Sequence, residues 1–96
     1  MDSQLENDEE VLFLAQSIEN SLADKYGQLI PSRSLWRELS YPSMTAMQRS
    51  ISRGSIGVPT FGLQHRRGRF ALTRDVAFWL AKQRCTAKPL SGILNE

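Results

Sequence analysis

A helical alternation of apolar and polar residues occupies the first quarter of the chain. Apolar residues recur every three or four positions between about Asp8 and Tyr26, namely Val11, Leu14, Ala15, Ile18 and Leu22. This spacing places them on one face of a helix. Asp8 and the two acids after it lie where the helix dipole favours negative charge, and Gly27 can adopt the left-handed conformation that ends helices. We therefore expect a helix over residues 8–26, preceded by a frayed segment from Met1 to Asn7.

Leu12 and Phe13 widen the apolar face of this helix beyond a single stripe. They have two interpretations, packing within their own domain or contact with a second copy of the chain. The first is the preferred expectation.

Two short helices are expected next, over Ser32 to Leu39 and Ser43 to Arg53, after a connection formed by residues 28–31. Ser32 and Ser43 have the side chains that cap helix N-termini. Pro42 cannot continue a helix, so it marks a turn between the two. The inward positions of this pair are Leu35, Trp36, Leu39, Met44, Met47 and Ile51, and Gly54 follows the second helix.

A β-hairpin and a closing helix are expected in the rest of the chain. Residues alternate between apolar and polar within Pro59 to Leu72, which predicts two strands with Phe61 and Leu63 on one and Phe70 and Leu72 on the other. Gly68 suits the turn between them because it tolerates a positive φ. Thr73 is the expected cap of a helix over residues 74–84, in which Val76, Trp79 and Leu80 form a core stripe and not a functional site.

The length and composition favour one small folded domain. A chain of 96 residues supports a single hydrophobic core, and a hydrophobic fraction of 41% is ordinary for a folded protein. The expected fold class is mainly α with a small β-hairpin, a winged helix-turn-helix preceded by an extra N-terminal helix. Its expected divisions are an acidic tail and helix (1–27), the winged helix-turn-helix (28–85) and a flexible tail (86–96). No apolar run approaches the roughly 20 residues of a membrane span, and a cytoplasmic protein with no membrane partner is expected.

Charge is divided unevenly along the sequence. Residues 1–24 carry seven acids and no Lys or Arg, a net charge of −7. All twelve Lys and Arg lie in residues 25–88 beside only two acids, a net charge of +10. A cationic module of this kind favours a polyanionic partner over ordinary surface charge.

The predicted helix from Ser43 to Arg53 has a polar face opposite its inward stripe. Its side chains can exchange hydrogen bonds with base edges, and the helix contains no carboxylate that phosphates would repel. The candidates on this face are Thr45, Gln48, Arg49 and Ser52. The alternative is an amphipathic helix that only exposes its polar side to water.

The tip of the predicted hairpin is rich in arginine. Such a tip is suited to contact phosphates or a narrow minor groove, while simple solvation is the alternative. Its candidates are Gln64, His65, Arg66, Arg67 and Arg69.

Enzymatic motifs are missing from the sequence. It has no paired carboxylates, Ser/His/Asp set, glycine-rich phosphate loop or cluster of metal ligands. Its single cysteine, Cys85, is interpreted as a small helix residue. We expect a protein that is not an enzyme and uses no cofactor or metal.

The segment from Leu29 to Arg84 resembles the AlpA and excisionase group of small winged helix-turn-helix proteins, which is related to the MerR-type DNA-binding domain. The resemblance depends on the order of several short motifs, which are Ser52-Arg53-Gly54 after the Ser43 cap, Val58-Pro59, Arg66-Arg67-Gly68-Arg69-Phe70 and Thr73-Arg74-Asp75-Val76-Ala77-Phe78-Trp79-Leu80. The chain departs from the family pattern at Ser50, which is commonly apolar, in a wing tip extended around Gln64 and His65, and in the added acidic helix.

The resemblance implies that the helix from Ser43 to Arg53 enters the major groove and that the hairpin, the wing, touches the DNA backbone or minor groove. The residues to which it assigns these roles are Thr45, Gln48, Arg49, Arg53, Arg66, Arg67 and Arg69. Family members act as transcriptional regulators or excision factors, often of phages and other mobile elements.

The functional hypothesis from sequence is therefore a sequence-specific double-stranded DNA-binding protein, binding as a homodimer or a cooperative oligomer. The alternative is a protein-interaction module on the same scaffold that binds a recombinase, a polymerase subunit or a host factor. RNA binding is a weaker third reading, because Phe61, Phe70 and Trp79 are better explained as core residues than as a stacking platform.

Overall fold

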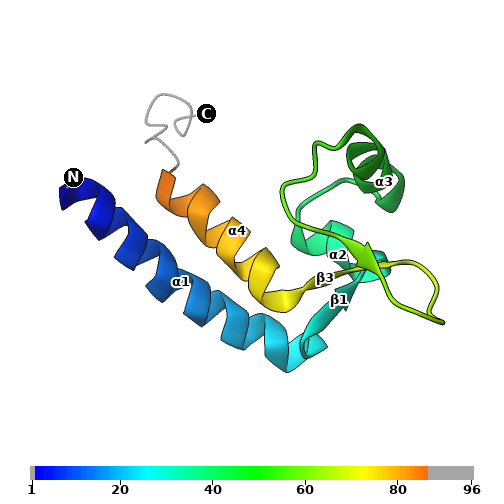
Figure 1. Ribbon diagram of the computed structural model, residues 1–96, viewed down its shortest axis with the longest axis horizontal. Coiled ribbons are helices and arrows are strands. Elements are labelled where there is room, and N and C mark those ends of the chain that lie inside the picture. The colour runs from blue at the N-terminus through cyan, green and yellow to red at the C-terminus, as the bar shows by residue number, and fades with distance from the viewer. Residues whose placement is uncertain (1, 87–96) are drawn as a thin grey trace.

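The computed structural model describes residues 2–86 of the chain. This part contains four helices and a three-stranded antiparallel sheet, which confirms the mainly helical class (Figure 1). The elements in chain order are α1 (Asp2–Tyr26), β1 (Leu29–Pro31), α2 (Ser32–Glu38), α3 (Met44–Arg53), β2 (Phe61–Gly62), β3 (Arg69–Leu72) and α4 (Thr73–Thr86). No helix in this range is both long enough and apolar enough to cross a membrane.

Two halves make up the molecule. Helices α1 and α4 run side by side in opposite directions and form one end, which we call the helix pair (Figure 1). The sheet, α2 and α3 form the other end, and the loop between β2 and β3 extends away from the helix pair. The residues predicted to be a flexible tail lie outside the described range from residue 87 onward, while Thr86 still belongs to α4.

The first strand of the sheet was not predicted, because residues 28–31 were expected to be a simple connection. Strand β3 lies in the centre of the sheet, with β1 and β2 on either side of it. Ile30 pairs with Ala71, and both side chains are completely buried. A three-residue strand gives no detectable alternation, so its partner on β3 defines it.

The predicted hairpin is present but shorter than expected. Phe61 pairs with Phe70 in register, whereas Leu63 lies outside β2. A positive φ of 82° at Gly68 agrees with the predicted turn, and His65 also has a positive φ, of 66°.

The main hydrophobic core lies where α2, α3 and α4 meet the sheet. Its largest fully buried side chains are Ile30, Leu35, Met47 and Val76. A smaller cluster joins the helix pair through Val11, Ala15 and Ala81.

Three large apolar side chains are exposed in the part of the chain that the structure describes. Leu12 is 61% exposed, Phe13 is 81% exposed and Phe78 is 42% exposed. The expectation that Leu12 and Phe13 pack within their own domain is therefore wrong. The helices meet through a narrow line that includes the small residues Ala15 and Ala81, so the side chains flanking this line stay in solvent.

The ends of the helices show which residues act as caps. The Ser43 hydroxyl accepts a hydrogen bond from the Ala46 amide (3.1 Å), and Gly54 ends α3 with a φ of 71°, both as predicted. Ser32 does not cap α2, because that helix begins at Ser32 and its N-cap is Pro31. Thr73 belongs to α4 itself, and its hydroxyl donates to the Gly27 carbonyl (2.6 Å), which ties the start of α4 to the end of α1.

The remaining difference concerns the start of α1, which begins at Asp2 and not at the predicted Asp8. Residues 2–7 contain no glycine or proline.

Gly57 provides a test of how the two halves are packed. A Cβ added at Gly57 would overlap the Trp79 indole at Nε1, so α4 touches the loop after α3 at this point. We expect Gly57→Ala to lower the free energy of unfolding by about 1 to 3 kcal/mol, because the Trp79 ring must move. Denaturant unfolding followed by circular dichroism would measure this change.

Gly62→Ala is the matched control for this measurement. A Cβ at Gly62 has no neighbour closer than 3.9 Å, and neither glycine needs a positive φ. The control should change the free energy of unfolding by less than about 0.5 kcal/mol. Equal effects of the two substitutions would contradict the packing argument.

Candidate nucleic-acid interface

Helix α3 is held by one face and presents the other to solvent. Met47 is completely buried, and Met44 and Ile51 are half-buried beside it. Five polar residues are exposed on the helix, and these are Thr45, Gln48, Arg49, Ser52 and Arg53. The burial of Met47 thus orients the outer face so that it carries hydrogen-bonding and cationic groups but no acid.

Ser50 is one of three places where the sequence departs from the pattern of the family that it resembles. Its side chain is buried, so a small hydroxyl takes the place of the commonly apolar residue. Its carbonyl oxygen accepts hydrogen bonds from the Ser55 amide (2.9 Å) and the Ser55 hydroxyl (3.3 Å). Ser50 therefore lies on the inner face, and the outer face keeps the residues predicted for it.

The loop between β2 and β3 also exposes the polar residues singled out from sequence. These are Gln64, His65, Arg66 and Arg67, together with Arg69 at the start of β3. The Arg66 amide donates to the Leu63 carbonyl (3.1 Å), which closes a turn.

The three arginines of this hairpin have different surroundings. The Arg69 guanidinium donates through Nε to Thr60 Oγ1 (2.9 Å) and through Nη2 to the Thr60 carbonyl (2.7 Å). The Arg66 guanidinium lies 5.7 Å from the centre of the Phe70 ring. Arg69 therefore braces the two sides of the hairpin, Arg66 covers an aromatic ring, and Arg67 is at the exposed turn between them.

Helix α2 adds two arginines that were not among the candidates predicted from the sequence. Arg33 and Arg37 are exposed, and the Arg37 guanidinium lies 5.1 Å from the centre of the Trp36 ring. Ser32 lies close to the hairpin, since its Oγ is 3.5 Å from the position that a Cβ would take at Gly68. Their i, i+4 spacing could have identified them from the sequence, because this spacing places two residues on one face of a helix.

These elements gather positive charge at one end of the molecule. Helices α2 and α3 and the hairpin loop all lie away from the free ends of the helix pair (Figure 1). Between residues 28 and 72 the chain has seven arginines and one acid, Glu38. We call this end of the molecule the basic end. Its exposed arginines are Arg33, Arg37, Arg49, Arg53, Arg66, Arg67 and Arg69.

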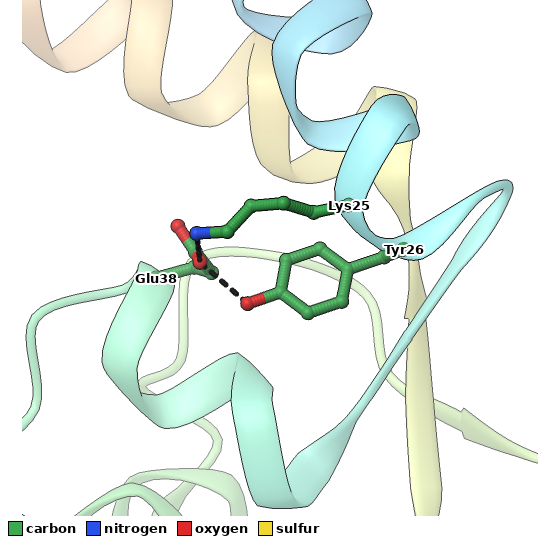
Figure 2. A network of polar contacts seen from close by, with 3 residues as sticks. All are labelled: Lys25, Tyr26 and Glu38. Atoms are coloured by element: carbon green, nitrogen blue, oxygen red, sulfur yellow. Dashed lines mark hydrogen bonds and ion pairs between the residues drawn. The ribbon is translucent and has the colours of Figure 1, made fainter.

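Glu38 is itself engaged by the end of α1 (Figure 2). The Tyr26 hydroxyl donates to Glu38 Oε2 (2.6 Å), and Lys25 Nζ lies 3.3 Å from the same oxygen. The Lys25 ammonium is also 5.5 Å from the centre of the Tyr26 ring. This contact joins α1 to α2 and partly neutralises the only acid of the basic end.

Other kinds of site find little support in the described residues. Residues 2–86 contain no group of three or more His, Cys, Asp or Glu side chains placed to hold a metal ion. Cys85 is a half-buried free thiol near the end of α4. The arrangement of the basic end is suited to binding an anionic surface.

Comparisons with family models, with curated proteins and with solved structures find no match to this chain. The functional interpretation therefore depends on the geometry and charge of its own residues.

The contact between Tyr26 and Glu38 makes the free energy of unfolding depend on pH in the alkaline range. The hydrogen bond to Glu38 raises the pKa of the Tyr26 hydroxyl above its usual value of 10.0, and burial and the charge of Glu38 act in the same direction. The folded state therefore holds this proton more tightly than the unfolded state. The stabilisation is complete below pH 10 and is lost as the pH rises through the higher pKa of the folded state.

We expect the free energy of unfolding to decrease as the pH rises above 10. Tyr26→Phe should remove the part of this decrease that comes from the contact with Glu38. Urea unfolding between neutral pH and pH 11 would measure both proteins, since urea carries no charge. Tyr41→Phe is the control, because it removes a tyrosine but leaves the contact between Tyr26 and Glu38 intact. A wild-type slope that survives in Tyr26→Phe would contradict the assignment.

Proposed function

We propose that this chain is a sequence-specific double-stranded DNA-binding protein, a transcriptional regulator or excisionase-like factor of a phage or other mobile element. The observation that carries the proposal is the exposed, acid-free face of α3. Its polar side chains offer both hydrogen bonding and positive charge along a single helix. Base edges in the major groove present the complementary groups.

The order of elements supports a winged helix-turn-helix as the finer description of the fold. Helices α2 and α3 are separated by a short turn at residues 39–43, and the β2–β3 hairpin follows them. In this description α3 is the recognition helix and the hairpin is the wing. Strand β1 joins the wing to the start of α2 through the central strand β3.

The dimensions of α3 fit the proposed contact. Its ten residues span about 15 Å, and the major groove of B-DNA is about 12 Å wide. In this arrangement Gln48 and Arg49 are the side chains suited to paired hydrogen bonds with adenine and guanine. Thr45 and Ser52 accompany them on the same face.

The remaining arginines are assigned to the phosphate backbone. Arg53 lies at the end of α3, Arg33 and Arg37 lie on α2, and Arg67 lies at the exposed turn of the wing. Phosphate contacts fix the register of a protein on DNA without reading sequence. Arg69, which already donates to Thr60, acts mainly by holding the shape of the wing.

A second function, protein binding by the helix pair, is favoured by one observation. Leu12, Phe13 and Phe78 are exposed on the helix pair. Exposed apolar side chains that gather on one part of a protein mark interaction surfaces. A recombinase, a polymerase subunit or a host factor is the kind of partner proposed there, and such binding is compatible with DNA at the other end.

Selection of random duplex DNA with the purified protein, at low and at moderate salt, tests the proposal directly. We expect an enriched motif, because side chains that contact base edges discriminate between bases. Binding without a motif would show an architectural role instead. Failure to bind any duplex at either salt would overturn the proposal and favour the protein-interaction function.

Arg49→Ala tests the reading of bases. We expect it to weaken binding to the selected site by about 1 to 3 kcal/mol and to relax sequence preference, as measured by titration against the selected and random duplexes. An equal loss on both duplexes would refute a base contact by Arg49.

Arg67→Ala tests the backbone contact of the wing. We expect weaker binding to every duplex, and a plot of log K against log salt whose slope is smaller by about 1. Arg84→Ala is the matched control, because it removes the same charge from the exposed surface of α4. If the two variants show the same salt slope, the proposed phosphate contact is wrong.

A further inference from the structure

A groove runs along one edge of the helix pair and is lined by both helices. Leu12, Gln16 and Glu19 of α1 line it on one side, and Arg74 and Phe78 of α4 line it on the other. Leu12 and Phe78 are two of the three exposed large hydrophobic residues described above. The groove therefore has an apolar centre formed by a side chain from each helix.

Charges of opposite sign border this centre on the two helices. On α1, exposed Glu9 lies one turn before Leu12, and Glu19 lies two turns after it. On α4, Arg74 and Lys82 lie one turn before and one turn after Phe78, and Lys82 Nζ is 5.5 Å from the centre of the Phe78 ring. The apolar residue thus lies between two acids on α1 and between two basic residues on α4, where Asp75 is an additional acid that lines the groove.

We propose that this groove is the contact surface for a second copy of the same chain, packed so that α1 of each copy lies over α4 of the other. Leu12 then meets Phe78 of the second copy, and Glu19 meets its Arg74. Glu9 meets Lys82 in the same way. Each of these contacts occurs twice, as a symmetric dimer requires.

Charge selects this arrangement over the other way of pairing two grooves. Placing α1 over α1 of the second copy would bring the acids Glu9 and Glu19 against the same acidic face of the second α1, and like charges oppose such contact. Asp75 is an acid on the α4 side, but it lies beside Arg74 in the first turn of α4, where the helix dipole stabilises it. The pairing of α1 with α4 is therefore the one in which opposite charges meet.

The pairing also fixes the direction of the dimer axis. Helices α1 and α4 run in opposite directions within each copy (Figure 1). Glu19 lines the same groove as Arg74. When α1 of each copy lies over α4 of the other, Glu19 and Arg74 of the two copies stay at the same height along the helices. The two-fold axis therefore runs parallel to the helix pair. Both basic ends then lie at the same end of the dimer.

This last point rests on the proposed function and extends it. Two basic ends at the same end of a dimer, related by a two-fold axis, are suited to two half-sites of opposite orientation on one face of a duplex. The contact between the copies does not depend on DNA, so it can be tested without DNA.

Sedimentation equilibrium of the full chain over about a hundredfold range of concentration tests the dimer. We expect the wild-type protein to associate reversibly to a dimer. Glu19→Arg alone and Arg74→Glu alone should each weaken self-association about tenfold, because each places like charges in contact twice. A wild-type protein that stays monomeric throughout would overturn the proposal.

Mixing the two variants separates contact between copies from contact within one chain. In a mixed dimer, Arg at position 19 of one copy meets Glu at position 74 of the other, and the unchanged Arg74 and Glu19 also meet. We expect the mixture to regain wild-type association. Two variants that remain monomeric when mixed would overturn the pairing of α1 with α4.

The opposite edge of the helix pair supplies the charge controls. Glu10 and Arg84 line a second groove there, together with Phe13. Glu10→Arg and Arg84→Glu carry the same changes in net charge and should each leave dimerisation unchanged. A loss of dimer in these variants equal to that in the Glu19 and Arg74 variants would show that net charge, and not this groove, is responsible.

Leu12→Ser and Phe13→Ser form a matched pair for the apolar contact. Both residues are exposed on α1, so neither substitution removes a buried side chain, and circular dichroism would verify that each variant is folded. We expect Leu12→Ser to weaken the dimer about tenfold and Phe13→Ser to have little effect. The reverse result would overturn the choice of groove, while loss of DNA binding in a protein that still dimerises would overturn only the proposed function.

Discussion

The burial of Met47 determines which side of α3 the protein presents to solvent. Met47 is enclosed with Ile30, Leu35 and Val76, which come from the strand before α2, from α2 itself and from α4. A helix fixed by one fully buried side chain at its middle cannot rotate without opening that core. The chemistry of the outer face of α3 is therefore a consequence of packing on the inner face.

Charge is distributed unevenly between the two ends of the molecule. The basic end has Glu38 as its single acid, and the Tyr26 hydroxyl and the Lys25 ammonium both contact this carboxylate. Most of the other acids lie on α1, which belongs to the helix pair. Phosphates attracted to one end would meet few carboxylates there, and the opposite end keeps both signs of charge for contacts of another kind.

The parts of the fold with a local signal were predictable from the sequence. The Ser43 cap and the glycine that ends α3 at residue 54 are both encoded within one or two turns of chain, and the structure has them where the pattern placed them. Strand β1 was missed because three residues carry no periodicity and pair with β3, about 40 positions later. The exposure of Phe13 was also missed, since it depends on how closely α1 approaches α4.

The candidate site also has some features that a local sequence pattern predicts and others that depend on residues far apart in the chain. The outward residues of α3 followed from helical spacing and Met47, so a sequence pattern was sufficient to group them. The separate surroundings of Arg66, Arg67 and Arg69 depend on the hairpin turn and on Thr60, which lies nine positions before Arg69. Arg33 and Arg37 join the same end only because β1 brings the start of α2 next to β3.

The placement of the two tryptophans has a spectroscopic consequence. Trp36 lies on α2 at the basic end beside Arg37, and Trp79 lies on α4 against Gly57. Both indoles pack against the main hydrophobic core, and their emission shifts in wavelength with the polarity around each ring. Replacing Trp36 by phenylalanine leaves Trp79 as the single fluorophore, whose emission then reports on the contact between α4 and the loop after α3.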